Sequence, residues 1–299
     1  LYGRMGNDII DGAVGMHTID GGSGNDTLIG SVADNELDGG TGTDTIYSGN
    51  GSDTIVLRSG DGSTTLSSAD VVKDFSDGND VLGMASVSFD DLTIAQGSGS
   101  YASHTLISVT STGEYLAILE NVSASNITVT DFASMSTSNQ TLIGTSADNT
   151  LIGGAGNDTI TTGSGTDLVL ASSGDDSITV DGAGNKTIDG GSGTDSLILN
   201  VSGVTSLSDF AFSTSDDYMV LSDLSGGRIQ YKSIESLTVG SSTYEQVTGQ
   251  YHNQYFWSSD EHKIYMYDNG TEVSGDFNYG NPDPTGFSKT RTLSVIGSS

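Results

Sequence analysis

Aliphatic residues recur at every ninth position from residue 1 to residue 54. Six consecutive units begin with one: LYGRMGNDI, IDGAVGMHT, IDGGSGNDT, LIGSVADNE, LDGGTGTDT and IYSGNGSDT. Gly, Asp, Asn, Ser and Thr fill most of the positions between them. Helical periodicity is scarce along the chain. The pattern therefore predicts very short strands, each pointing one aliphatic side chain inward, joined by polar turns.

The same pattern returns at residue 142 after a long interruption. Its units are LIGTSADNT, LIGGAGNDT, ITTGSGTDL, VLASSGDDS, ITVDGAGNKT with one extra residue, and IDGGSGTDS. A fixed repeat of this kind is typical of solenoids, in which each unit packs against its neighbours along the array. The chain is expected to be all-β, with two parallel β-rolls at 1–63 and 142–199.

The segments outside the arrays predict more ordinary β structure. Thr105–Val109 and Tyr115–Leu119 are apolar runs between polar turns, which predicts strands in a β cap and spacer at 64–141. A second β cap is expected at 200–247, and a small β module at 248–299. Within that module, residues 263–267 and 271–273 flank Asp268-Asn269-Gly270, which predicts a hairpin. The module is rich in aromatic residues: Tyr251, Tyr255, Phe256, Trp257, Tyr265, Tyr267, Phe277, Tyr279 and Phe287.

Composition agrees with a thin core and adds a strong charge. Hydrophobic residues make up 34% of the chain and 42 residues are Gly, which does not suit a large core. The 39 acidic residues against 9 Lys and Arg give a net charge of −30, and only seven of the acids are Glu. Asp is favoured in turns and in loops that bind hard cations. The charge argues against nucleic acid or an anionic membrane as partner, and no apolar run is long enough to span a membrane.

The best units fit G-G-x-G-x-D-x-U-x, where U is aliphatic. Glycine lets backbone carbonyls approach an ion, and Asp supplies the oxygen ligands that Ca²⁺ requires. A flexible linker is the alternative, but a linker needs neither a phased aliphatic residue nor a phased Asp. Calcium is the expected cofactor, bound as several ions. The absence of Cys excludes disulfides and thiolate metal sites.

At these units the chain resembles the RTX (repeat-in-toxin) family. IDGGSGNDT, LDGGTGTDT, LIGGAGNDT and IDGGSGTDS match the motif closely, and SADVVKDFSDGNDVLGM and YKSIESLTVG resemble the segments that follow RTX rolls. The resemblance implies that two units make one coil and that Ca²⁺ lies between turns stacked on the same side. It also implies type I secretion and folding outside the cell, where calcium is plentiful.

If two units make a coil, ligands on one edge of the roll recur every 18 residues. One edge of each array then keeps its carboxylates, whereas the other has lost some to His17, Asn35, Asn149 and Asn185. Calcium should therefore occupy the intact edges best, and Asp53 and Asp167 should form the weakest sites. The predicted metal ligands are Asp8, Asp26, Asp44, Asp53, Asp158, Asp167, Asp176 and Asp195, with backbone oxygens at or near Gly21, Gly39, Gly153 and Gly190.

No enzyme motif appears along the chain. It lacks H-E-x-x-H and G-x-S-x-G, and His104, His252 and His262 form no spaced cluster. Asp260-Glu261-His262 is interpreted as a solvated loop. We expect a non-catalytic, secreted protein of the cell surface, structural or adhesive, in a surface layer, sheath, filament or large adhesin. The alternative is the calcium-dependent folding and secretion tail of an extracellular protease or lipase.

The two ends of the chain raise two further expectations. The sequence opens within a repeat and without Met, which indicates a fragment or a processed product with more repeats before it, or a second subunit stacked there. The aromatic module at 248–299 either forms its own core or contacts a partner. Besides calcium, the expected partners are copies of the chain, other surface proteins or glycans.

Overall fold

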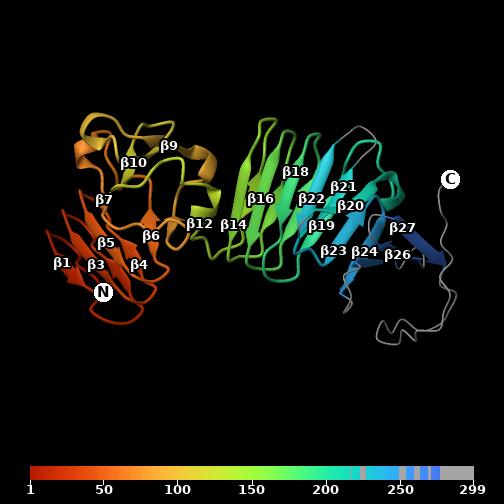
Figure 1. The fold of residues 1–299 in the computed structure, drawn as a ribbon, viewed down its shortest axis with the longest axis horizontal. Helices are drawn as coiled ribbons and strands as arrows, with labels where there is room; N and C mark the ends of the chain where they lie inside the picture. Colours follow the sequence, from red (N-terminus) through yellow and green to blue (C-terminus); the bar gives the residue numbers. More distant parts are fainter. Residues whose placement is uncertain (216, 223–226, 249–253, 259–262, 269–270, 277–299) are drawn as a thin grey trace. The chain divides into compact units, whose positions relative to one another are not determined.

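The computed structural model describes residues 1–299 except 216, 223–226, 249–253, 259–262, 269–270 and 277–299 (Figure 1). The described residues form strands and short 3-10 turns and no α-helix, so the prediction of an all-β protein is confirmed. None of the described elements is a helix long and apolar enough to cross a membrane. The chain divides into two compact units, 1–135 and 136–299.

The first unit is a parallel β-roll with two facing sets of strands. One sheet begins with β1 (Ile9–Asp11), β3 (Thr27–Ser31), β5 (Thr45–Gly49) and β7 (Val71–Val72). The other holds β2 (Thr18–Asp20), β4 (Glu36–Asp38), β6 (Thr54–Leu57), β8 (Val81–Met84) and β12 (Phe132–Ser134). Ile10 pairs with Leu28 and Leu28 with Ile46, a spacing of 18 residues. Two nine-residue units therefore make one coil, as the resemblance to the RTX family implies.

Residues after the first array continue the roll and then close it. Strands β7 and β8 pair in parallel with β5 and β6. Strands β9 (Leu92–Gln96), β10 (Thr105–Val109) and β11 (Tyr115–Leu119) complete the first sheet, and β11 lies parallel to β7. The two strands predicted from apolar runs in this segment are confirmed with the bounds expected. Four short 3-10 turns complete the segment: η1 (Leu66–Ser68), η2 (Phe89–Asp91), η3 (Gly99–Tyr101) and η4 (Val129–Asp131).

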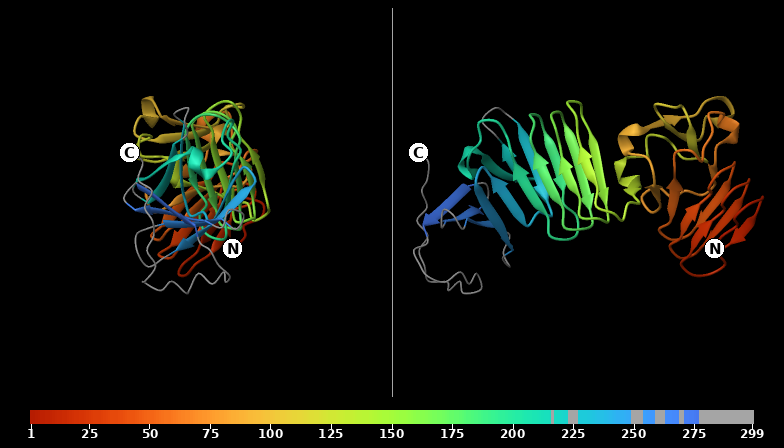
Figure 2. Two further views of the ribbon diagram at one scale, coloured as in Figure 1. Left: turned by 90° about the vertical axis from the view of Figure 1, so that its right-hand side faces the viewer. Right: turned by 180° about the vertical axis from the view of Figure 1, so that it is seen from behind.

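The second unit contains the second parallel β-roll (Figure 2). One sheet runs through β13 (Thr141–Ile143), β15 (Thr159–Thr161), β17 (Ser177–Val180), β19 (Ser196–Leu199) and β23 (Ser236–Val239). The other runs through β14 (Thr150–Gly154), β16 (Asp167–Ser172), β18 (Lys186–Asp189) and β22 (Arg228–Lys232). The extra residue of the fifth unit changes the register from 18 to 19, since Leu151 pairs with Val169 but Val169 pairs with Ile188.

Antiparallel strands close the second unit. β20 (Ala211–Ser215), which follows the 3-10 turn η5 (Leu207–Asp209), and β21 (Tyr218–Ser222) extend one sheet beyond β22. β24 (Ser242–Thr248), β25 (Gln254–Ser258), β26 (Lys263–Asp268) and β27 (Thr271–Asp276) extend the other beyond β23. The predicted hairpin is confirmed as β26 and β27, which continue the sheet of the roll. The interpretations of Tyr251, His252, Asp260-Glu261-His262, Phe277, Tyr279 and Phe287 lie outside the described residues.

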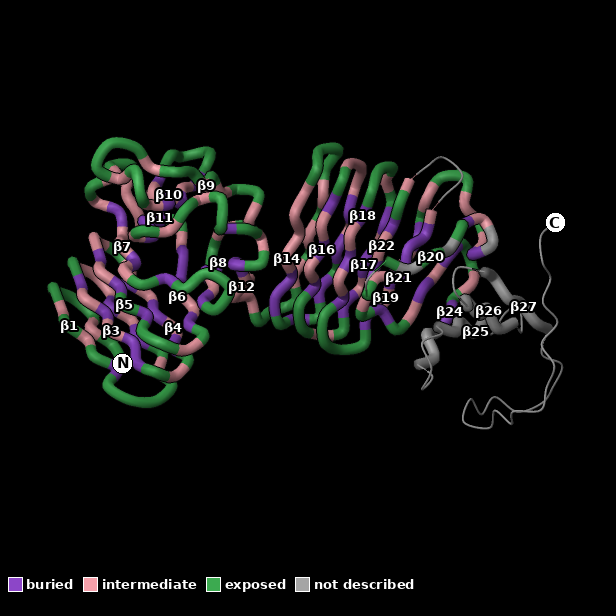
Figure 3. The backbone as a smooth tube through the Cα atoms, in the orientation of Figure 1, coloured by how far each residue is buried: buried purple, intermediate pink, exposed green. Residues whose placement is uncertain are grey.

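The core is a narrow stack of the phased aliphatic residues. Ile19, Leu28, Leu37, Ile46 and Ile55 are at most 2% exposed. Figure 3 shows buried residues along the strands and exposed residues along the turns. Each such side chain stabilises the roll by about 1.5–3 kcal/mol relative to exposure.

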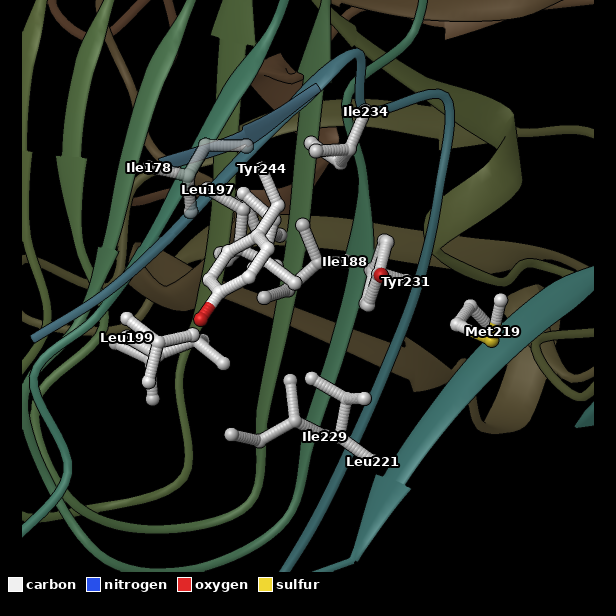
Figure 4. Packing of buried hydrophobic residues seen from close by; sticks show 14 of the residues in the cluster. Ile178, Ile188, Leu197, Leu199, Met219, Leu221, Ile229, Tyr231, Ile234 and Tyr244 are labelled. Atoms are coloured by element: carbon white, nitrogen blue, oxygen red, sulfur yellow. The ribbon is translucent and has the colours of Figure 1, made fainter. Parts of the chain in front are cut away.

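The core of the second unit widens where its closing strands pack over the roll. There the stack meets Phe210, Met219, Tyr231 and Tyr244, each at most 5% exposed. Figure 4 shows Met219, Tyr231 and Tyr244 among the aliphatic residues of the stack. These larger side chains cover the last coil of the array.

Candidate calcium-binding edges

The repeat Asp lies two residues before each buried aliphatic residue, at the junction of turn and strand. One of its oxygens, Oδ1, accepts a hydrogen bond from the backbone N–H one coil earlier. Asp8 N–H donates to Asp26 Oδ1 at 2.7 Å, and Asp26 N–H donates to Asp44 Oδ1 at 2.7 Å. Asp158 and Asp176 donate in the same way to the next carboxylate, at 2.6 and 2.8 Å. Each intact edge is therefore a ladder in which every carboxylate is fixed by the preceding coil.

The second oxygen of each carboxylate, Oδ2, is buried and accepts no hydrogen bond. This holds for seven of the predicted ligands: Asp8, Asp26, Asp44, Asp53, Asp158, Asp176 and Asp195. A buried carboxylate oxygen without a partner is costly unless a cation neutralises it. Oxygen is the ligand that Ca²⁺ takes from proteins, so the orphaned atoms fit that ion.

Glycine at the third position of the repeat leaves the space in which an ion would lie. A Cβ on Gly21 would be 2.6 Å from Asp26 Oδ2 and 2.6 Å from the carbonyl oxygen of Gly39. A Cβ on Gly39 would be 2.6 Å from Asp44 Oδ2. Gly153 beside Asp158 and Gly190 beside Asp195 repeat the arrangement. All four predicted glycines thus lie against an orphaned carboxylate oxygen, and ligation by carbonyls around them stays a prediction.

No three acidic or histidine side chains converge on one point anywhere in the described part of the chain. The carboxylates of an edge follow one another at coil spacing. A Ca²⁺ ion with six to eight oxygen ligands must therefore draw most of its shell from backbone carbonyls and water.

Burial raises the pKa of several carboxylates along these edges. Burial, only partly offset by the backbone hydrogen bond, raises the pKa of Asp44, Asp53 and Asp195 to about 6. The same cause raises the pKa of Asp70 to about 8 and that of Asp158 and Asp176 above the usual value. Neighbouring carboxylates add to the increase for all of these except Asp158. A bound divalent ion would favour the ionised carboxylates and so oppose both effects.

The edges with lost carboxylates satisfy these side chains with backbone groups of the same turn and, for Asn35, also of the preceding coil. Asn35 Oδ1 accepts the Ser31 N–H at 2.7 Å, and Asn35 Nδ2 donates to the Gly15 carbonyl at 3.1 Å. Asn149 Oδ1 accepts the Thr145 N–H at 2.7 Å. His17 Nε2 lies 3.1 Å from the Val14 carbonyl oxygen. These side chains close their turns by hydrogen bonds and present no charge to an ion.

One position on the degraded edge of the second array was assigned wrongly. The sequence places Asn185 level with Asp167, but the sheet pairs Asp167 with Lys186. The extra residue of the unit lies in the turn before β18, which shifts the strand by one position. Asp167 Oδ2 accepts no hydrogen bond of good geometry but lies 2.9 Å from Lys186 Nζ. This predicted calcium ligand already faces a cation.

Sequence reasoning missed the residues that continue each ladder past the arrays. Asp44 N–H donates to Asp70 Oδ1 at 2.8 Å, and Asp53 N–H donates to Asp80 Oδ1 at 3.1 Å. Asp195 N–H donates to Glu235 Oε2 at 2.7 Å. Each acid lies two residues before a buried aliphatic residue, as in the repeats. That spacing alone could have identified them.

Comparison with known proteins agrees with this geometry. The RTX calcium-binding nonapeptide repeat matches residues 1–15, 18–63, 143–178 and 180–200 in four copies. The two arrays are RTX repeats. The chain therefore carries calcium-binding repeats in both of its units.

Two solved structures are similar to parts of the chain. The AlgE6R3 subunit of the mannuronan C5-epimerase from Azotobacter vinelandii is 22% identical, with a TM-score of 0.34, over 44% of this chain and 79% of that one. The extracellular lipase LipA from Serratia marcescens is 13% identical, with a TM-score of 0.23, over 69% of this chain and 37% of the lipase. No curated protein matches the sequence.

Proposed function

We propose that the chain is a calcium-binding structural or adhesive protein of the extracellular surface, without catalytic activity of its own, that folds on Ca²⁺ after secretion. The two RTX arrays support calcium binding, and RTX repeats are typical of secreted proteins. The ladder of buried, partnerless Oδ2 atoms is the observation that carries the proposal. Such carboxylates oppose folding where calcium is scarce and favour it where calcium is abundant.

The net charge of −30 supports the same order of events. A chain with so few cations repels itself until bound ions neutralise part of the charge. Extracellular calcium modules bind with dissociation constants of about 10⁻⁴–10⁻³ M, so they remain empty in a low-calcium cytoplasm. An unfolded chain of this kind suits one-step type I export.

Cell fractionation tests the surface role. The cells that make the full-length protein would be washed either with calcium or with a chelator. Antibodies against residues 1–135 would then detect the protein in each fraction. We expect the protein in the surface fraction with calcium and its release by the chelator, because the rolls unfold when the ions leave. The opposite result would be protein free in the medium under both conditions, with a protease or lipase activity on the same polypeptide. That result would show that the chain is the secretion tail of an enzyme.

A further inference from the structure

Lys186 is a fully buried cation on the degraded edge of the second roll. The residue is 1% exposed, and Asp167 opposite it is 2% exposed. Lysine is almost never this deeply buried unless it is paired. The chain has only 9 Lys and Arg, so placing one of them inside the roll requires a specific reason.

The ammonium of Lys186 contacts oxygen atoms from two successive coils. It donates to the carbonyl oxygen of Gly165 at 2.7 Å and to that of Ala183 at 3.0 Å. It also lies 2.9 Å from Asp167 Oδ2. Gly165 belongs to the turn of one coil and Ala183 to the turn of the next. The three oxygens are of the kinds a calcium ion would use here: a repeat carboxylate and turn carbonyls from stacked coils.

The register explains why lysine reaches this point. Lys186 opens β18 and pairs with Asp167, the first residue of β16, so it stands where the ladder would place the next carboxylate. Lysine has no acceptor, and the Asp167 N–H accordingly donates to the Asn185 carbonyl at 2.9 Å. The ladder of carboxylates ends at this coil and a positive charge replaces it.

We propose that Lys186 Nζ is a resident cation that takes the place of a calcium ion between the coils of β16 and β18. An ammonium supplies one charge and three donors, which balances the single carboxylate of Asp167. This pair of coils then closes without calcium, whereas coils on the intact edge need the ion. The inference rests on the proposed calcium binding of the intact edges but concerns a position that they do not include.

Removing the ammonium should create a calcium site. In Lys186→Ala, Asp167 Oδ2 and the two carbonyls lose their cation and gain room for an ion and its water. We expect the full-length variant to bind one more Ca²⁺ per chain than wild type, measured by equilibrium dialysis and metal analysis. Its melting temperature should drop in limiting calcium and recover most of that loss in saturating calcium. An unchanged stoichiometry with equal destabilisation in both conditions would show an ordinary buried ion pair and overturn the proposal.

A second variant keeps the test decisive if Lys186→Ala does not fold. The double variant Asp167→Asn/Lys186→Met removes both charges at nearly constant volume, and Asp176→Asn on the intact edge is its matched control. We expect the double variant to bind as many ions as wild type, and the control to bind fewer. Loss of an ion from the double variant would show that Asp167 binds calcium despite Lys186, which overturns the proposal. Wild type that binds no calcium would refute the proposed function instead.

Discussion

The two oxygens of the repeat Asp have different tasks. Oδ1 accepts a backbone hydrogen bond from the previous coil, and an amide oxygen could accept that bond equally well. Oδ2 is buried without a hydrogen-bond partner, and its negative charge suits a bound cation. Asn35 and Asn149 turn their amides to their own turns instead. The choice between Asp and Asn at one position therefore separates a coil that needs an ion from one that does not.

The Asp26→Asn substitution tests this division. It keeps an oxygen for the Asp8 N–H but removes the charge, so calcium affinity at that site should fall about tenfold, or ~1.4 kcal/mol. Stability in chelator should stay equal or rise, because a desolvated charge is gone. Calcium titration would measure the first effect, and the β signal of the two proteins in chelator, by circular dichroism, would measure the second.

The matched control for that substitution is Asp77→Asn, an equal change of charge at an exposed residue. We expect it to alter neither calcium binding nor stability in chelator. If both variants lost calcium affinity equally, the long-range charge of the chain rather than the orphaned oxygen would govern binding.

The raised pKa values predict how calcium-free stability varies with pH. Carboxyls that hold their proton more tightly when folded favour the folded state at low pH. Stability should therefore be greatest near the unfolded pKa of about 4 and decline as the pH rises through about 6 for Asp44, Asp53 and Asp195 and about 8 for Asp70. The β signal of calcium-depleted protein, measured by circular dichroism across this range, would show the decline.

Asp70→Asn provides the control for the upper part of this profile. The variant should lose the decline near pH 8 and keep the one near pH 6, because Asp70 alone has a pKa of about 8 among these groups. A wild-type profile that rises with pH would contradict the sign. With calcium present, affinity should instead weaken as the pH falls through about 6, since protons then compete with the ion.

At the scale of the coil, glycine at the third repeat position leaves room beside the carboxylate on the intact edge. Gly21→Ala would place a Cβ 2.6 Å from both Asp26 Oδ2 and the Gly39 carbonyl oxygen. We expect loss of calcium at that site and destabilisation of ~1–3 kcal/mol, as in other overpacked sites. Calcium stoichiometry and denaturant unfolding would measure both.

Gly12 is the same repeat position on the opposite edge, beside His17. A Cβ there would be 3.2 Å from Ile19 Cδ1 and 3.3 Å from the Ile29 carbonyl oxygen, which a small shift can relieve. Gly12→Ala should cost less than ~1 kcal/mol and leave the bound calcium unchanged. Equal loss of calcium in both variants would mean that backbone packing, and not the space beside a carboxylate, controls the site.

At the scale of the whole molecule, we expect calcium and the thin core together to determine whether the chain folds. One stacked aliphatic residue per turn does not offset a net charge of −30 and a row of buried carboxylates. Circular dichroism should show a largely disordered chain in chelator that gains β signal as Ca²⁺ rises toward ~1 mM. Equal β content with and without calcium would contradict this prediction.

The two ends of the chain carry predictions that these observations leave open. The first coil exposes Tyr2, Met5, Ile9 and Val14 at 72–85%. That further coils or a second copy of the chain cover these side chains stays a prediction. A variant without residues 250–299 would be assayed for secretion and assembly. This assay would distinguish a segment that only caps the fold from one that binds a partner. The backbone of β25 to β27 continues the sheet of the second roll, which places that segment next to the array.

The sequence by itself determined the two β-rolls and the positions of the repeat carboxylates. These follow from periodicity, because a phased aliphatic residue and a phased Asp keep the same place in every coil whatever surrounds them. That two units make one coil was implied by the resemblance to the RTX family and not by the spacing. Even Asp70, Asp80 and Glu235 obey that local spacing, although the repeat pattern had ended.

Tertiary structure alone decided what lies beside each carboxylate. The extra residue near Asn185 could be absorbed before or after the strand, and only the pairing of β16 with β18 puts Lys186 against Asp167. The orphaned Oδ2 atoms likewise depend on contacts between coils at least 18 residues apart. Register and burial arise when coils stack, so a one-residue insertion can replace an ion with an ammonium while the repeat still looks intact.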